Sequence, residues 1–174
     1  MSNHHEQVNR AQRFVAFVIE RIKKDKGIAA VFRRADNPAT EYQCWEQLAA
    51  FNIELEKPYE RVPFAAIAAA IAKTKAEQNG AIGIGRMLAS CYEEGCESNQ
   101  AKTKLRRLLA CDSVEEVCRI LRPLFSLIES RSDKCLDFAN LLNELLRFHS
   151  NSQQIKSRWA QDFYRRTTNA EVNT

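Results

Sequence analysis

Apolar side chains recur at spacings of three and four residues along nearly the whole chain, and no segment alternates apolar and polar residues as a half-buried strand does. Only five glycines and four prolines interrupt this pattern. The segments with helical spacing are 8–24, 27–35, 41–51, 63–78, 83–92, 99–111, 114–128, 134–149 and 152–167. The sequence therefore predicts an all-α protein, a compact helical bundle of about eight to nine helices, built either as one unit or as two packed sub-bundles.

Length and composition are those of an ordinary soluble domain. At 174 residues the chain can bury roughly two-thirds of its extended surface, so we expect a single domain over 1–174 with flexible ends at 1–7 and 168–174. The longest apolar run, 62–72, is too short to cross a bilayer, which takes about 20 residues. The N-terminus lacks the apolar core of a secretory signal. We therefore expect a cytoplasmic protein.

Proline and glycine predict the limits of a central helix. Pro58 and Pro63 are expected to bracket a loop, and the alanine-rich helix at 63–78 that follows is expected to end at Asn79-Gly80. This helix is apolar nearly all round, which is typical of a helix in the middle of a bundle. Its small side chains would let a neighbouring helix approach closely.

Aromatic residues fall on the apolar stripes of the predicted helices. The segment 41–51, for example, places Tyr42, Trp45 and Leu48 on one side. Aromatic rings can stack on nucleic-acid bases, but a position on an apolar stripe favours packing in the core. We therefore expect the following rings to be buried: Trp45, Phe125, Trp159 and Phe163.

The two signs of charge are unevenly distributed along the chain, although the net charge is only +4. Residues 20–36 carry six bases against three acids, and residues 102–134 carry eight bases against five acids. Residues 41–60 are the reverse, with five glutamates and one lysine. This segregation predicts a basic face and an acidic face, and it favours an anionic partner.

The sequence offers no catalytic or metal-binding pattern. Its three histidines, His4, His5 and His149, have no metal-ligand spacing, and no Ser-His-Asp arrangement carries local signature residues. The six cysteines include no C-x-x-C pair and are interpreted as structural thiols, with a disulfide or a metal site as the alternative. We expect no catalytic residue, no metal and no cofactor.

The glycine-rich segment 80–85 does not fit a nucleotide-binding loop. No predicted strand precedes it, and Leu88 stands where the third glycine of G-x-G-x-x-G would be. Two interpretations remain. A glycine turn that opens a helix can offer backbone N–H groups to a phosphate, with Arg86 adding a charge, or it can form a tight turn between packed helices.

Basic residues divide into those with an acidic neighbour on the same helix and those without one. Arg119 has glutamates one turn behind it and Arg158 has Asp162 one turn ahead, so local ion pairs explain both. The others are candidates to bind an external anion, although a solvated face would show the same pattern. These candidates are Arg33, Arg34, Arg86, Arg106, Arg107 and Lys156.

Five segments occur in an order that is specific as a set. They are Gly27-Ile28-Ala29-Ala30-Val31-Phe32-Arg33-Arg34-Ala35, Gly83-Ile84-Gly85-Arg86-Met87-Leu88-Ala89, Leu105-Arg106-Arg107-Leu108-Leu109-Ala110-Cys111, Leu121-Arg122-Pro123-Leu124 and Arg158-Trp159-Ala160-Gln161-Asp162-Phe163-Tyr164. Over about residues 10–166 the chain resembles the CasB family, the small subunit of the type I-E CRISPR surveillance complex Cascade. It departs from the family pattern at Gly83-Ile84, where Ser-Leu is usual, and at Phe32, where leucine usually precedes the arginine pair.

The resemblance implies a non-catalytic, all-helical subunit that acts in antiviral defence. Its implied partners are other Cascade subunits, the CRISPR RNA ribonucleoprotein, the target and displaced DNA strands of the R-loop, and a second copy of itself. Because the guide RNA reads the sequence by base pairing, such a subunit needs affinity only for the nucleic-acid backbone. The residues implied to contact phosphates are Arg33, Arg34, Arg86, Arg106, Arg107 and Arg122, and Lys156 is added on charge alone.

Two other functions remain open on the sequence. A helical adaptor would bind only protein, through the acidic stretch 41–60 and the alanine-rich surface, and would have no affinity for nucleic acid. An enzyme would need a cleft with convergent titratable groups, and no pattern in the sequence predicts one.

Overall fold

The structure is a computed structural model that describes the backbone of residues 2–165 and the side chains of residues 10–165. Nine α-helices are present in this part of the chain: α1 (Ser2–Lys24), α2 (Lys26–Arg33), α3 (Trp45–Ala50), α4 (Pro58–Thr74), α5 (Ile84–Ser90), α6 (Asn99–Leu109), α7 (Val114–Arg131), α8 (Phe138–Leu146) and α9 (Phe148–Tyr164). Two 3-10 helices, η1 (Glu41–Cys44) and η2 (Gly95–Glu97), complete the described elements. The predicted all-α bundle is confirmed, whereas the predicted flexible end at 168–174 lies outside the described residues.

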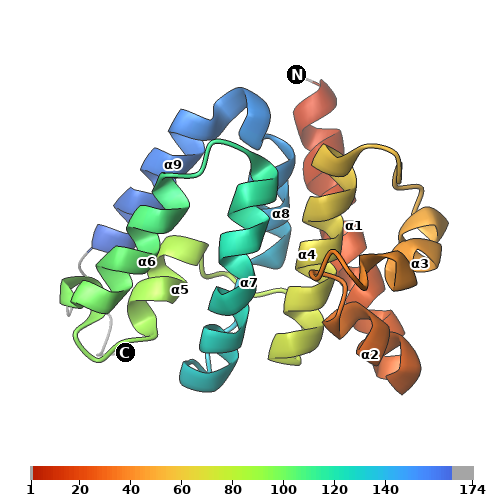
Figure 1. The fold of residues 1–174 in the computed structure, drawn as a ribbon, viewed down its shortest axis with the longest axis horizontal. Coiled ribbons are helices and arrows are strands. Elements are labelled where there is room, and N and C mark those ends of the chain that lie inside the picture. The colour runs from red at the N-terminus through yellow and green to blue at the C-terminus, as the bar shows by residue number, and fades with distance from the viewer. Residues whose placement is uncertain (1, 166–174) are drawn as a thin grey trace.

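The alanine-rich helix α4 lies in the middle of the molecule (Figure 1). Every residue from Pro63 to Ala72 is buried, and the helix packs against α1, α2, α7 and α8. The predicted central position is therefore confirmed. The predicted loop between the two prolines is wrong: Pro58 is the first residue of α4, where a missing N–H costs nothing, and Pro63 continues the same helix.

The predicted end of α4 at Asn79-Gly80 is also wrong. The helix ends at Thr74, and Lys75 takes the left-handed conformation with φ of 51°. Gly80 instead allows close packing of two backbone segments, because a Cβ atom there would lie 2.0 Å from the carbonyl oxygen of Cys135. The Gly80 N–H donates to the carbonyl of Leu136 at 2.9 Å, which joins the α4–α5 connection to the start of α8.

In the segment that contains η1 and α3, the predicted inward position is confirmed for Leu48 and is wrong for Tyr42 and Trp45. Glu41, Cys44 and Leu48 point inward, whereas Tyr42 is 59% exposed and Trp45 is 37% exposed. The segment begins as a 3-10 turn with about three residues per turn, which shifts the register expected from a continuous α-helix. The predicted core position of Trp45 is therefore wrong, while those of the other three rings are confirmed: Phe125, Trp159 and Phe163.

Helices α5, α6 and α9 form the left part of the molecule in Figure 1, and α7 lies between them and α2. The contact between α5 and α9 is close because Gly85 has no side chain: a Cβ atom there would lie 2.2 Å from the Trp159 carbonyl oxygen. Helix α6 rests on α5, α7 and α9. The polar side of α6 therefore faces away from these three helices, toward solvent.

Candidate nucleic-acid interface

The arginine pair of α6 lies on the outer side of its helix. Leu105 and Leu108 are buried against the neighbouring helices, so Arg106 and Arg107 are turned to solvent and are exposed. Ser98 caps the helix by accepting from the Ala101 N–H at 3.4 Å. Neither guanidinium forms an ion pair with a carboxylate within the described residues. Both charges are therefore available to an external anion.

Two further cations, Lys156 and Arg119, act electrostatically on Cys111, which follows the C-terminal end of α6. The Cys111 thiol donates to the Arg107 carbonyl at 3.3 Å. Burial raises the pKa of Cys111, and the charges of Glu116 and Asp112 raise it too, while the charges of Lys156 and Arg119 lower it, so groups of both signs act on this thiol. Positive charge at the C-terminal end of a helix is also favoured by the helix dipole. Lys156 is half-buried and lies 5.7 Å from the ring centre of Phe148, which partly accounts for its position.

Arg119 was not among the predicted anion-binding residues, because the sequence suggested local ion pairs for it. Its expected partners were Glu115 and Glu116, and neither forms an ion pair with it among the described residues. The Oε2 atom of Glu116 instead accepts from the Asp112 N–H at 2.9 Å, and the Glu116 N–H donates to Ser113 Oγ at 3.2 Å. Arg119 is exposed and forms no ion pair in the described part of the chain. The capping-box spacing of Ser113 and Glu116 was the signal that the glutamate would not be free for an ion pair.

The arginine pair of α2 is presented in a similar way. Asp25 caps the helix by accepting from the Gly27 N–H at 2.7 Å, and Phe32 is buried, so Arg33 and Arg34 point outward and are exposed. Arg34 donates from Nε to the Ala30 carbonyl at 3.3 Å. Neither residue forms an ion pair among the described side chains, which leaves both charges uncompensated.

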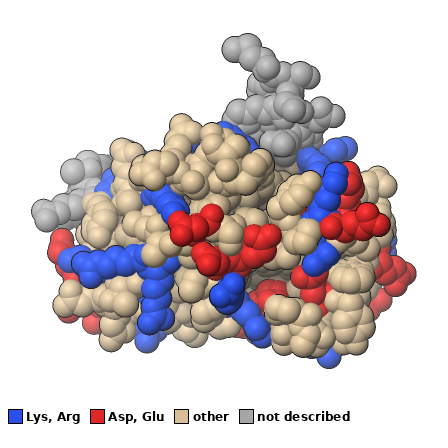
Figure 2. Space-filling model, turned by 45° about the horizontal axis from the view of Figure 1, so that its top comes forward, with Lys and Arg blue, Asp and Glu red and all other residues tan. Residues whose placement is uncertain are grey.

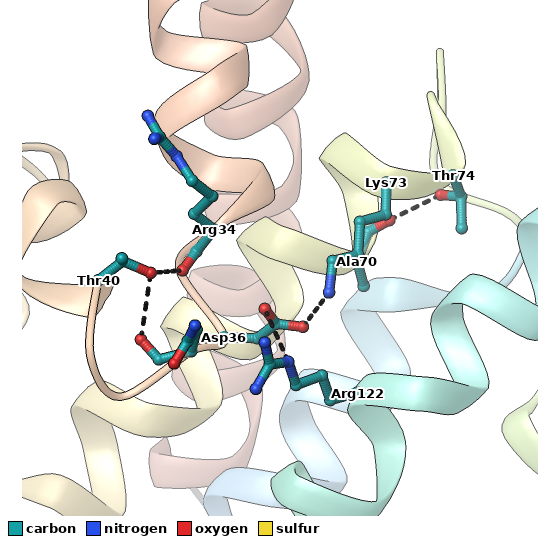
Figure 3. A network of polar contacts seen from close by, with 8 residues as sticks. Arg34, Asp36, Thr40, Ala70, Lys73, Thr74 and Arg122 are labelled. Carbon is teal, nitrogen blue, oxygen red and sulfur yellow. Dashed lines mark hydrogen bonds and ion pairs between the residues drawn. The ribbon is translucent and has the colours of Figure 1, made fainter.

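Arg122 differs from these pairs because it has an acidic partner inside the protein. Its Nε atom lies 3.7 Å from Asp36 Oδ1, and Lys73 of α4 binds the other oxygen of the same carboxylate (Figure 3). Asp36 is almost completely buried. The guanidinium of Arg34 is turned away from this carboxylate in the same view. Arg122 therefore has a structural role, and its contact with a phosphate stays a prediction.

The start of α5 already holds a carboxylate. The Arg86 N–H donates to Asp162 Oδ2 at 3.1 Å, and a Cβ atom on Gly83 would lie 2.6 Å from the same oxygen. Together with the close fit of Gly85 on α9, this favours the tight helix-packing turn over the backbone phosphate site. The Arg86 side chain is exposed and has no ion pair within the described residues, so only its guanidinium remains a candidate.

Asp162 was predicted to pair with Arg158 on α9. The Arg158 NH1 atom instead lies 3.5 Å from Glu144 Oε1 of α8, and the Trp159 Nε1–H donates to Glu144 Oε2 at 2.7 Å. Burial raises the pKa of Glu144, while these two donors lower it. The local pair expected from the sequence is replaced by a pair between helices.

Three of the five glutamates in the acidic stretch 41–60 form internal ion pairs. Glu41 binds Arg61, Glu54 binds Lys57, and Glu60 binds Arg10 at 2.6 Å. The view in Figure 2 shows basic and acidic side chains in small neighbouring groups on one face. The predicted separation into one basic face and one acidic face does not hold for that face.

The candidate cations form two groups along the long axis of the molecule. The first group is carried by α6 with one residue each from α7 and α9, and the second by the C-terminal end of α2 with one residue from α7 (Figure 1). The first group contains Arg106, Arg107, Lys156 and Arg119, and the second contains Arg33, Arg34 and Arg122. Arg86 belongs to α5 on the side of the first group.

The described residues contain no group of three or more histidines, cysteines or acids that could hold a metal ion. All six cysteines are free thiols. Burial raises the pKa of Cys44 to about 12 and also raises that of Cys118, so these thiols stay protonated at neutral pH. Among the helices described, none combines the length and the apolar character needed to span a membrane.

Residues 28–164 match the family described as CRISPR-associated protein Cse2. The chain belongs to the Cse2 family. The CRISPR-associated protein Cse2 of Thermus thermophilus is 30% identical over 95 residues, which cover 54% of this chain and 53% of that relative. The match thus spans about half the length of the curated relative.

The fold of this Cse2 family member also resembles solved structures. It matches M. ruber CasB with a TM-score of 0.70 and 24% identity, over 89% of this chain and 92% of that chain. It matches a chain of a CRISPR RNA-guided surveillance complex with a TM-score of 0.70 and 21% identity, over 91% of this chain and 92% of that chain. The predicted resemblance to CasB is confirmed, and at these identities the structural likeness concerns the fold.

Proposed function

We propose that this Cse2 family member is a non-catalytic small subunit of a CRISPR RNA-guided surveillance complex, in which it binds nucleic-acid backbone without regard to sequence and stabilises the opened DNA strands. The observation that carries the proposal is a set of exposed guanidinium groups without carboxylate partners in the described part of a Cse2 chain. They are those of Arg33, Arg34, Arg86, Arg106 and Arg107.

The chemistry of these residues suits a phosphate backbone. A guanidinium group matches phosphate geometry and stays charged at any physiological pH. The helices that carry the two arginine pairs, α6 and α2, lie toward different ends of the long axis, so the two pairs can contact separate stretches of one strand (Figure 1). Exchange between a DNA duplex and a guide–target hybrid is nearly balanced, so a few such contacts are enough to favour the opened state.

The experiment is a titration of labelled single-stranded DNA with the full chain at several salt concentrations, from about 50 to 200 mM. Each phosphate contact contributes about 0.7 to the slope of log affinity against log salt for a single strand. The variant Arg106→Ala/Arg107→Ala is expected to lower the magnitude of this slope by about 1.4 and to weaken binding at low salt.

A matched control removes the same net charge elsewhere. Lys24 and Lys57 are already paired with Glu20 and Glu54, so Lys24→Ala/Lys57→Ala should leave the slope unchanged. Equal slopes for the two double variants would contradict the proposal. A wild-type chain that binds no single-stranded DNA at low salt would instead favour the adaptor that binds only protein.

A further inference from the structure

Two exposed aromatic residues, Tyr42 and Trp45, belong to the junction of η1 and α3, and α3 lies at the end of the molecule away from α5, α6 and α9 (Figure 1). Tyr42 is 59% exposed and Trp45 is 37% exposed, and they are two of the four large hydrophobic side chains exposed in the described part. Residues three apart in a 3-10 turn lie above one another, so both rings face the same side. Neighbouring exposed apolar side chains mark a candidate interaction site.

The Trp45 ring is held in position by the protein itself. Its Nε1–H donates to Glu41 Oε1 at 3.0 Å, and the Arg61 guanidinium lies 5.4 Å from the ring centre. The buried Glu41 carboxylate also accepts from Arg61 Nε, so the three side chains fix one another. A ring that is already immobilised loses little conformational freedom on binding, which is a property of interface residues that dominate affinity.

The stretch that carries the two rings contains two exposed glutamates without an ion pair among the described residues. Glu46 directly follows Trp45 on α3, and it is exposed with no ion pair among the described residues. Glu56 in the following loop is exposed in the same way. The charge of Arg61 is compensated by Glu41. Phosphate groups are repelled by this arrangement, whereas a lysine or arginine side chain is attracted to it.

We propose that Tyr42, Trp45 and Glu46 form a docking site for a protein segment that presents a lysine or arginine side chain. The methylene stem of that side chain lies on the two rings, and its charged end pairs with Glu46. The inference rests on the proposed function, because the segment belongs to another protein subunit of the surveillance complex. The site uses the acidic stretch for protein binding and leaves the arginines of α2 and α6 for nucleic acid.

The experiment measures binding of the purified full chain to a surveillance complex assembled from its other subunits and guide RNA without this subunit. Tyr42→Ala and Glu46→Arg change exposed side chains and leave the core intact, and Tyr42→Ala/Trp45→Ala removes both rings. Each is expected to weaken binding, the double variant by about tenfold or more. Tyr164→Ala removes an aromatic side chain that is 47% exposed on α9 and should change affinity by less than about twofold.

The outcomes separate this inference from the proposed function. If the wild-type chain joins the complex and all three variants bind within about twofold of it, this inference alone is overturned. If the wild-type chain does not join the complex, both are overturned. A parallel titration with labelled single-stranded DNA should show no loss for the double variant. A loss there as large as for the complex would mean that the rings stack on bases, and would overturn the docking site.

Discussion

The buried carboxylate of Asp36 connects three elements, and its removal should destabilise the protein by a predictable amount. Asp36 lies in the loop after α2 with 3% of its side chain exposed, and it binds Lys73 of α4 and Arg122 of α7 (Figure 3). Asp36→Asn keeps the shape of the side chain but leaves the Lys73 ammonium, which is 15% exposed, without an anion. The cost therefore depends on the burial of Lys73.

Removal of one partner from a buried ion pair costs about 3–5 kcal/mol. Because Lys73 keeps some contact with water, we expect the lower limit, about 3 kcal/mol in the free energy of unfolding. Arg122 is 43% exposed and lies 3.7 Å from the carboxylate, so Arg122→Ala should cost less than about 1 kcal/mol. For a chain of this length, about 3 kcal/mol corresponds to a melting temperature roughly 6–12 °C lower.

Urea unfolding followed by circular dichroism measures these differences. The double variant Asp36→Asn/Lys73→Met serves as the control, since it removes the unpaired charge and should recover most of the lost stability. The reasoning is refuted if Asp36→Asn loses less than about 1 kcal/mol, or if the second substitution restores nothing. A loss of equal size for Arg122→Ala would show that the exposed end of the network carries the stability instead.

Two further predictions concern the junction of α5, α8 and α9. Gly85→Ala places a Cβ atom 2.2 Å from the Trp159 carbonyl oxygen, so α5 must move. The free energy of unfolding should therefore fall by about 1–3 kcal/mol. An unchanged melting temperature would contradict the close contact. Burial raises the pKa of Glu144 in the folded protein, so folding favours the protonated carboxyl group. The wild type should therefore gain stability relative to Glu144→Gln as the pH falls from about 7 to about 5. Urea unfolding of both proteins at the two pH values checks the sign, and a constant difference would count against it.

The sequence predicted the features of the fold that depend on residues close together in the chain. Spacings of three and four residues identified the helices, and the alternation of Leu105 and Leu108 with Arg106 and Arg107 predicted which side of α6 faces solvent. The order of five short motifs identified the family. Each of these signals lies within a few turns of one helix, where the chain itself determines which side chains share a face.

Features that depend on distant residues could not be predicted in this way. The direction of Trp45 depends on Glu41 and on Arg61, which lies 20 residues beyond Glu41 and holds it inside. The carboxylate at the start of α5 comes from Asp162, 76 residues after Arg86. No local spacing reveals such partners, because only the packing of whole helices brings them together.

The alanine-rich helix at the centre has a consequence for how the protein can vary. Its buried positions from Ala65 to Ala70 are methyl groups, apart from Ile67, and they are already close to the smallest side chain available. A substitution there can remove almost no side-chain volume, and a larger side chain finds no free space because the interior is packed as densely as a crystal. Smaller residues cannot loosen this helix much further, whereas any bulkier residue would push apart the helices packed against it, among them α1, α2, α7 and α8.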